Sequence, residues 1–422
     1  MSFRSEQAPM SDTPYPNAAG GASASKSRIL FVDDEDMVLR MLRLAMSTQS
    51  DSWEPSFAAS GAEALKLLSE GSYDMVVSDM RMPGMTGAQL LNEIFRLYPS
   101  TFRVILTGFV EQERVMESVG TAHQILSKPF QLDVLKELLS RAASLKQRLQ
   151  SRRARLIIAQ TGCVPSVPDV YFKILDALQE PDCPVERIAD IAANDPGLTS
   201  KLLQLVNSAF FGFGSTVSAP REAVMLLGTG TIRSLALTCG LFSAFSPEIS
   251  RELDLQEIWA HSWRVARAAE RIARSERSDT VVIEQAFTAG LLHDLGKLIF
   301  ANALHSEYVS AVQSAAAESR PLSELENEKF EATHAEVGAC LLQLWGLPTP
   351  LVEAVLHHEQ PDGERCEGFS PLLAVHVANA LDHESRPSKP PQPVPLNVTF
   401  LEQSGLAPRL NAWRQHLSAE DA

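Results

Sequence analysis

Two groups of polar side chains in this 422-residue sequence have types and spacings that suit chemistry. In the first half, an acidic residue, a threonine or a lysine follows each of several short apolar runs: Asp33 with Asp34, Asp79, Thr107 and Lys128. Converging carboxylates repel one another, and a hard divalent cation such as Mg²⁺ relieves that repulsion. An aspartate nucleophile beside Mg²⁺, with a hydroxyl and an ammonium to receive the developing oxygens, is what phosphoryl transfer to a carboxylate requires.

The second half contains histidines that are spread over several helical segments: His261, His293 beside Asp294, His334, and the pair His357 and His358. The stretch from Gly290 to Phe300 is apolar apart from a few residues, and unpaired polar groups are costly to bury in such a run. Imidazole and carboxylate are ligands for Zn, Fe or Mn, and a bound metal lowers the pKa of a water that can then attack a phosphodiester. A lone histidine is more often a core or surface residue than a metal ligand, so the metal hypothesis rests on the number of histidines in these segments.

Short apolar strands that alternate with helical segments must position the first group. The expected strands are Arg28–Val32, a segment around Phe57, Met75–Ser78, Val104–Leu106 and Gln124–Leu126. This alternation predicts a doubly wound α/β domain, in which a parallel sheet has helices on both faces. Functional groups gather at the carboxyl ends of the strands in such a sheet, which would bring the acidic residues, the threonine and the lysine together.

From Val164 onward the sequence predicts helices and no strands. Asp195 and Pro196 form a helix start, with a capping side chain followed by proline at the first helical position. Longer helices are expected over Ile258–Ala273 and Ile283–Ala303, and the second of these runs through the His293–Asp294 pair. We therefore expect an all-α domain of many packed helices after the α/β domain.

Length and composition indicate a multidomain protein of the cytoplasm. The sequence shows no apolar signal core and no uninterrupted membrane-length segment, and its five cysteines include no CxxC pair. The formal net charge of −15 argues against nonspecific nucleic-acid binding. The expected organisation is a disordered segment over 1–25, the α/β domain over 26–144, a linker helix over 145–163, the all-α domain over 164–385, and a Pro-rich connector and tail over 386–422.

The first domain resembles the receiver domain of two-component response regulators. The resemblance is carried by Phe31-Val-Asp-Asp-Glu35, Ser78-Asp-Met-Arg-Met-Pro-Gly84, Leu106-Thr107 and Ser127-Lys-Pro-Phe130. It implies a flavodoxin-like fold, a sensor histidine kinase or phosphotransfer protein as phosphodonor, and Mg²⁺ as cofactor. The implied site consists of Asp79 as phosphoacceptor, Asp33, Asp34, Asp79 and the main-chain carbonyl of Arg81 as metal ligands, and Thr107 and Lys128 as residues that sense the phosphoryl group.

One position departs from the receiver pattern. Three residues before Lys128, where receiver domains usually carry a tyrosine or phenylalanine, this sequence has Ile125. The aromatic switch of the family cannot work here in its usual form. Phosphorylation is still expected, and the route by which the signal leaves the domain is left open.

The second domain resembles the HDOD domain, a relative of the HD metal-dependent phosphohydrolases. Matching segments are Asp195-Pro-Gly-Leu198, Leu205-Val-Asn-Ser-Ala209, Leu226-Leu-Gly228, Gly290-Leu-Leu-His-Asp-Leu-Gly-Lys297, His334-Ala-Glu-Val-Gly338, Leu344-Trp-Gly-Leu-Pro348 and His357-His358. The resemblance implies a metal set of His261, His293, Asp294 and a final aspartate, which is replaced by Asn379. His376 and Asp382 are expected to point away from the site and to be poor substitutes.

The sequence is compatible with three functions. The first is a phosphorylation-controlled regulator whose HDOD domain binds a downstream signalling protein and turns over no substrate of its own. The second is a metal-dependent phosphohydrolase in which His334, His357 and His358 compensate for Asn379. It includes the cyclic-di-GMP phosphodiesterases of the HD-GYP type, whose half-motif matches at His357–Gly363 without the Gly-Tyr-Pro ending. The third, disfavoured by net charge, is nucleic-acid binding by basic linker residues; no membrane partner is expected, and a homodimer is left open.

Overall fold

The structure of the chain is a computed structural model. It describes residues 26–47, 53–108, 121–148, 151–161, 183–208, 216–238, 245–361, 368–385 and 394–418, with the single positions 173, 176, 177 and 180. The segment over 1–25 that is expected to be disordered and the Pro-rich stretch at 386–393 lie outside the described residues. No helix in the described part of the chain has both the length and the apolar character needed to cross a membrane.

The α/β domain contains a five-stranded parallel sheet, as the sequence predicts. Its strands lie in the order β2-β1-β3-β4-β5, which is the flavodoxin-like doubly wound order. All residues of the central strand β3 are buried, as expected for a parallel sheet covered on both faces. The strand bounds are β1 Ser27–Val32, β2 Trp53–Ala58, β3 Met75–Asp79, β4 Phe102–Gly108 and β5 Gln124–Lys128.

Helices α1 (Asp36–Ser47), α2 (Gly61–Glu70) and α3 (Gly87–Leu97) belong to this domain. A capping box formed by Thr86 and Gln89 fixes the start of α3. The first residue of that helix must be small, because a Cβ on Gly87 would lie 2.0 Å from the main-chain oxygen of Asp79. The start of α3 is therefore packed directly against the carboxyl end of β3.

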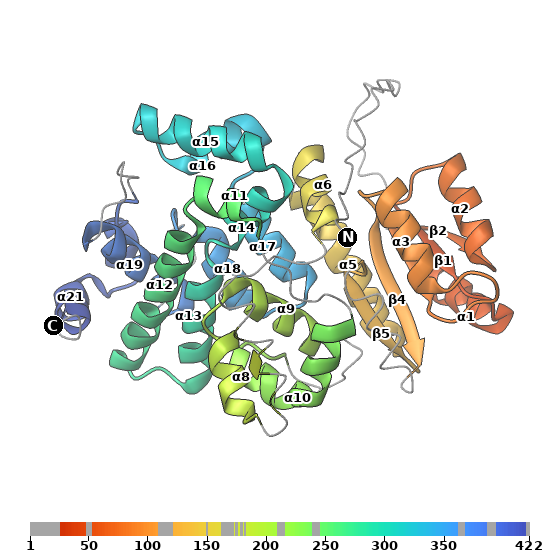
Figure 1. Cartoon of the computed structure of the whole chain (residues 1–422), viewed down its shortest axis with the longest axis horizontal. Helices are drawn as coiled ribbons and strands as arrows, with labels where there is room; N and C mark the ends of the chain where they lie inside the picture. Colours follow the sequence, from red (N-terminus) through yellow and green to blue (C-terminus); the bar gives the residue numbers. More distant parts are fainter. Residues whose placement is uncertain are drawn as a thin grey trace.

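Two helices connect the sheet to the rest of the chain. They are α5 (Leu132–Arg148) and α6 (Arg152–Gln160), and Figure 1 shows them between the sheet and the helical region. Helix α6 packs against two helices of that region, α14 and α17. One arginine of the basic linker, Arg153, forms an ion pair with Glu307.

The second half of the described chain is helical throughout, which confirms the predicted α/β-plus-all-α organisation. Asp195 caps α9 as expected, since its carboxylate accepts a hydrogen bond from the amide of Leu198 at 2.6 Å and Pro196 opens the helix. The helices are α8 Val185–Ala192, α9 Pro196–Val206, α10 Pro220–Thr238, α11 Pro247–Glu252, α12 Leu255–Ser275, α13 Thr280–Leu292, α14 Leu295–Ala303, α15 His305–Glu318, α16 Leu322–Phe330, α17 His334–Leu344, α18 Thr349–His357, α19 Pro371–Ser385, α20 Val398–Gln403, a 3₁₀ turn at Ala407–Arg409, and α21 Leu410–Ser418.

The prediction of one continuous helix over Ile283–Ala303 is wrong. The chain forms α13 and α14 instead, which are separated at His293 and Asp294. The backbone of Asp294 leaves the helical region, with φ −97° and ψ 12°. This break gives the two polar residues directions that an unbroken helix would not allow, and it sets up the histidine cluster described below.

Candidate functional site

The first site lies at the carboxyl edge of the sheet, where the ends of β1, β3 and β5 converge. The ammonium of Lys128 donates to Asp33 Oδ2 at 2.7 Å and forms an ion pair with Asp79. The second oxygen of Asp79 accepts a hydrogen bond from the amide of Arg81 at 2.6 Å. Two buried carboxylates that lie far apart in the sequence thus share one cation.

Burial controls the electrostatics of this pocket. It raises the pKa of Asp79 above its ordinary value, since the interaction with Lys128 offsets the loss of solvent only in part and the charge of Asp33 adds to the rise. Burial alone would lower the pKa of Lys128, but its hydrogen bonds to the two aspartates outweigh that effect and raise it. The pocket therefore holds more carboxylate charge than one lysine neutralises.

The other residues predicted for this site are Thr107, Asp34 and Arg81. Thr107 is buried at the end of β4, in register with Ser127 of β5. Asp34 follows Asp33 and is exposed, and within the described contacts it touches neither Asp79 nor Lys128. The amide of Arg81 contacts Asp79, whereas the role of its carbonyl stays a prediction.

The residues present fit a magnesium ion. Asp33 and Asp79 supply hard carboxylate oxygens at one point, and Asp34 lies beside them at the solvent-exposed end of β1. A divalent cation here would offset both the burial and the Asp33 charge that raise the pKa of Asp79.

The second site is a buried cluster in the helical region, made of two triads that share one carboxylate. In one triad, Nε2 of His261 and of His293 lie 3.9 and 3.4 Å from Asp294 Oδ2. In the other, Nε2 of His334 and of His358 lie 3.5 and 3.7 Å from Asp294 Oδ1. The sequence predicted these five residues together with His357 and Asn379, and the structure brings the five together.

Each imidazole of the cluster is oriented by a hydrogen bond at its outer nitrogen. Nδ1 of His293 contacts the carbonyl of Gly290 at 2.7 Å, and Nδ1 of His358 contacts that of Val355 at 2.8 Å. A carbonyl only accepts, so these nitrogens carry the proton, and the inward Nε2 of each ring offers a lone pair. The other two rings are held by carboxylates, Glu326 at 2.7 Å from His334 Nδ1 and Asp382 at 2.7 Å from His261 Nδ1.

This arrangement fits a bound transition metal. Nε2 of His261 lies 3.2 Å from Nε2 of His293, and two facing lone pairs repel unless a cation or a proton lies between them. Among the described residues, Asp294 Oδ1 has no hydrogen-bond partner although it is buried. Inward imidazole nitrogens with outward hydrogen bonds to carboxylates and carbonyls are the usual surroundings of a protein-bound metal.

Electrostatics act differently on the rings of the cluster: burial favours the neutral form of His261 and His358, whereas Glu326 and Glu359 outweigh burial and raise the pKa of His334. Burial lowers the pKa of His261 and holds that of His358 well below its ordinary value. Burial alone would raise the pKa of Asp294, but the neighbouring His293 and Lys297 outweigh it and hold the pKa well below the usual range. Lys297 donates to Asp294 Oδ2 at 2.8 Å, so one of the two carboxylate oxygens already has a cationic neighbour.

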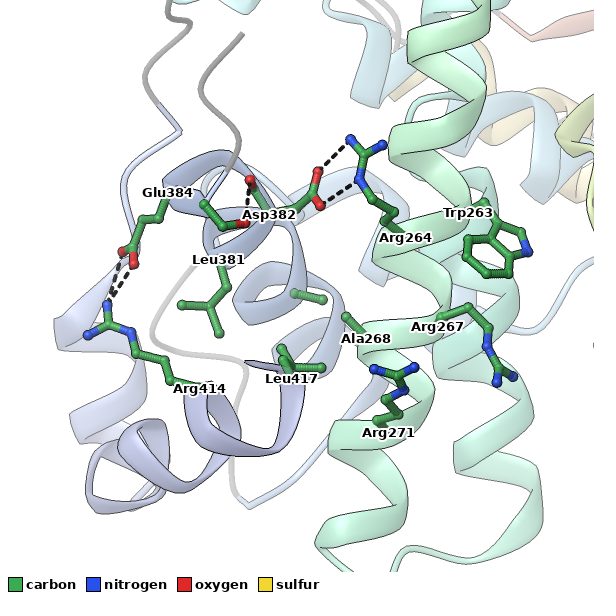
Figure 2. Close-up of a pocket in the computed structure, with 12 residues that line it drawn as sticks. Trp263, Arg264, Arg267, Ala268, Arg271, Leu381, Asp382, Glu384, Arg414 and Leu417 are labelled. Atoms are coloured by element: carbon green, nitrogen blue, oxygen red, sulfur yellow. Dashed lines mark hydrogen bonds and ion pairs between the residues drawn. The ribbon is translucent and has the colours of Figure 1, made fainter. Parts of the chain in front are cut away.

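Two expectations about this site need correction. Asp382 does not point away from the cluster, since it binds His261 and also accepts two hydrogen bonds from Arg264, at 2.8 and 3.0 Å (Figure 2). Positions three apart on a helix share a face, so Asp382 lies on the same side of α19 as Asn379. His357 belongs to neither triad.

The remaining two residues of α19 behave differently. His376 turns to the C-terminal segment and accepts a hydrogen bond from the amide of Asn397 at 2.9 Å, as expected of a residue outside the site. Asn379 is buried, and its side-chain oxygen has no hydrogen-bond partner among the described residues. An unpaired buried oxygen at this position is consistent with a weak neutral ligand.

Sequence reasoning missed the residues that support the cluster from outside. Asp382 and Glu326 orient two of its rings, and Lys297 neutralises its carboxylate. The spacing of Asp382 from Asn379 was a usable signal. Glu326 lies in α16, eight positions before His334, and no local pattern marks it.

Gly296 holds α14 close to α17, and its replacement tests that packing. A Cβ at this position would lie 1.9 Å from the carbonyl oxygen of His334, so Gly296→Ala must move one helix. We expect a loss of about 1–3 kcal/mol in the free energy of unfolding, measured by urea titration. Asn302→Ala, at an exposed position of the same helix, is the control. Equal stability of the two variants would contradict this close contact.

Comparison with known families agrees with the two domains. Residues 29–140 match the response regulator receiver domain, and residues 164–361 match the HDOD domain. A protein of Treponema pallidum described as uncharacterized is 26% identical over 248 residues, which are 58% of this chain and 45% of that protein. The regulatory protein AtoC of Escherichia coli is 37% identical over 121 residues, 28% of this chain and 26% of AtoC. The chain thus spans less than half the length of these curated relatives.

Two solved structures are similar to parts of the chain. The MmoQ response regulator of Methylococcus capsulatus is 28% identical, and the match covers 60% of this chain and 93% of that one with a TM-score of 0.48. The response regulator protein TrrA of Thermotoga maritima, solved in complex with Mg²⁺ and BeF, is 33% identical over 28% of this chain and 98% of its own, with a TM-score of 0.25. From the two family matches, in the order in which the chain carries them, this protein is a response regulator of two-component signalling, with a receiver domain followed by an HDOD domain.

Proposed function

We propose that the protein is switched by phosphorylation of Asp79 and that its HDOD domain is the output module. The observation that carries this proposal is the shared contact of Asp33 and Asp79 with Lys128 at the carboxyl edge of the sheet. The phosphodonor is a sensor histidine kinase or a phosphotransfer protein. The Asp79 carboxylate attacks the phosphorus of the donor's phosphohistidine, the P–N bond breaks, and the imidazole of the donor histidine is the leaving group.

Each residue of the pocket has a distinct part in this reaction. Asp33, Asp34, Asp79 and the carbonyl of Arg81 would hold Mg²⁺, which would supply positive charge to offset that of the transferring phosphoryl oxygens. After transfer, Lys128 contacts one phosphoryl oxygen and the Thr107 hydroxyl contacts another. Support for the lysine comes from its present position between the two aspartates.

Helix α1 offers a docking surface for the phosphodonor. Met37, Met41 and Leu44 have exposed fractions of 82%, 41% and 74%, and their spacing places them on one face of the helix. This helix starts three residues after Asp33, so a protein bound to it is close to the acidic pocket. An exposed apolar stripe of this kind is typical of a protein contact.

Strand β5 connects the pocket to the HDOD domain. Lys128 is at its carboxyl end, and Gln124 at its amino end donates to the carbonyl of Leu344 in α17 at 2.6 Å. Between them, Ile125 lines a small cavity together with Gln204 and other residues of and after α9. The position that usually carries the aromatic switch thus lies against the output domain, and we infer that the signal passes through this strand.

Buried polar contacts join the amino ends of β4 and β5 to α6 and α9. The guanidinium of Arg103 in β4 donates to the carbonyl of Ala159 at 2.7 Å, near the end of α6. The carbonyl of His123 accepts from Gln204 of α9 at 3.3 Å. Burial lowers the pKa of Arg103 to about 9, and the partial negative charge at the C-terminus of α6 favours the cation there. A shift of β4 or β5 would disturb these contacts.

Hydrogen exchange of the full chain tests this route. Beryllofluoride with Mg²⁺ is expected to change amide exchange in both β5 and α17, and Asp79→Asn is expected to show no change in either. In Gln124→Ala, which loses one buried hydrogen bond of about 1 kcal/mol, the response of α17 should weaken while that of β5 remains. Gln131→Ala, at an exposed position, is the control. An undiminished response of α17 in Gln124→Ala would exclude the proposed contact.

The HDOD domain then binds or releases a downstream signalling protein. Large exposed apolar side chains on α10, Met225 at 71% and Leu226 at 38%, are consistent with such a contact. Replacement of the final metal-binding aspartate of HD enzymes by Asn379 supports a binding role over turnover, because an amide adds no charge to a metal site.

A specific observation favours a second candidate function, a metal-dependent phosphohydrolase. Two triads share Asp294, so the cluster can hold metal without an aspartate at position 379. His261 and His293 would be ligands on one side and His334 and His358 on the other. A metal held in this way would supply an activated water for phosphoester hydrolysis. Lys297, at 2.8 Å from Asp294, is placed to neutralise charge at the edge of that site.

A further inference from the structure

A cavity of about 360 Å³ lies beside the histidine cluster, between α12, α19 and α21. Figure 2 shows Arg264 of α12 and Arg414 of α21, each joined to a carboxylate of α19. The volume is within the range of sites for small molecules, roughly 300–1,000 Å³. Neither family match nor the phosphorylation site accounts for it.

The cavity is rich in arginine, although the chain as a whole carries a net charge of −15. Arg264, Arg267 and Arg271 line it from one face of α12, since positions three and seven apart in a helix share a face. Arg414 adds a fourth guanidinium from α21, and two carboxylates, Asp382 and Glu384, complete the charged lining. The side chains that line the cavity therefore carry a net charge of +2, four arginines against two carboxylates. The chain as a whole is negative and repels anions.

Two of these arginines have partners that an anion can replace. Arg414 pairs with Glu384, and their side chains are 45% and 48% exposed. Arg267, which is 45% exposed, pairs with Glu270, which is 15% exposed and also pairs with Arg274, so this glutamate keeps a cationic partner when an anion takes Arg267. Exposed ion pairs contribute little, about 0–1 kcal/mol, so exchange of the glutamate for a ligand anion has a small penalty. Arg264 is different, because Asp382 and Glu257 both hold it in place.

The walls of the cavity are fixed independently of these pairs. Trp413 is fully buried and donates to Glu276 at 2.8 Å, and Arg409 donates to the same carboxylate at 2.8 Å. These contacts anchor α21 to the end of α12. Leu381 and Leu417 contribute apolar surface between the charged groups (Figure 2). The arginines are thus presented on rigid elements, which favours binding of a ligand over closure of the gap.

We propose that this cavity binds a small anionic ligand that carries at least two phosphate groups. Several separate guanidiniums along two helices match more than one anionic group, and the planar fork of arginine fits phosphate oxygens in pairs. The cavity is too small for a macromolecular partner. Asp382, which lines the cavity, also accepts a hydrogen bond from His261 and orients that ring. A ligand in the cavity would therefore contact a residue that supports the histidine cluster.

Calorimetric titration of the full chain with inorganic pyrophosphate tests this proposal, in buffer with EDTA so that no divalent metal bridges the ligand. We expect saturable binding that weakens as salt concentration rises. The double variant Arg267→Gln/Arg271→Gln should bind about tenfold more weakly or worse, and Arg267→Lys/Arg271→Lys should keep part of the affinity.

Arg187→Gln is the matched control, because Arg187 is 50% exposed, pairs with Glu180 on the surface, and does not line the cavity. It should bind as the unaltered chain does. Thermal unfolding of each variant shows whether it is folded. If the double variant does not fold, Arg414→Gln removes a guanidinium on another helix and tests the same cavity. Absence of pyrophosphate binding, or equal loss in Arg187→Gln, would overturn the proposal.

Discussion

Asp79→Asn is expected to abolish phosphorylation of this protein completely. The carboxylate of Asp79 lies where β3 ends, beside Asp33 and in contact with Lys128. An amide cannot attack phosphorus to form the acyl phosphate, and no other buried aspartate of the described sheet contacts both the lysine and the amide of Arg81. Because burial raises the pKa of Asp79, its charge is lost at a higher pH than that of an ordinary aspartate, so the rate should also fall as the solution becomes acidic.

The measurement is incorporation of phosphate from a small phosphodonor with Mg²⁺, followed by mass spectrometry of the intact chain. Asp36→Asn is the matched control, since Asp36 is an exposed aspartate that opens α1 close to the pocket. It should be phosphorylated at the rate of the unaltered chain. Phosphate on the Asp79→Asn chain would show that the acceptor is another residue.

Asp294→Ala is expected to remove metal from the histidine cluster, because this carboxylate belongs to both triads. Loss of a supporting residue outside the ligands weakens metal binding by about 10–100-fold, and loss of the shared ligand should weaken it further. The remaining imidazole nitrogens, 3.2 Å apart between His261 and His293, would then face each other without the carboxylate that both rings share.

Elemental analysis of the full chain after purification with Mn, Fe or Zn measures the metal directly. Thermal unfolding with and without added metal gives a second readout, since an ion that binds only the folded state raises the midpoint. His305→Ala is the control, because His305 lies outside both triads. Equal metal content in the two variants, or none in the unaltered chain, would rule out this centre. Phosphohydrolase activity lost with the metal would then decide for the second candidate function over the binding role.

Local patterns in the sequence determined much of this protein. Apolar runs such as Arg28–Val32, each ended by a polar residue, predicted the strands and the edge at which the acidic pocket forms, and Asp195–Pro196 predicted a helix start that the structure confirms. The motifs around Asp79 and His293 identified both domains. These features are local, because a strand, a cap or a short motif depends on neighbours in the chain.

Tertiary structure alone decided what these residues contact. The sequence predicted an unbroken helix through His293, and only the packing of α13 and α14 shows the break that turns Asp294 between two pairs of histidines. The packing also brings Asp382 into contact with His261, 121 positions away in the sequence, and Gln124 into contact with Leu344, 220 positions away. Periodicity specifies which face of a helix or strand is buried but not which distant side chain it meets. That choice is made when the helices and the sheet pack together.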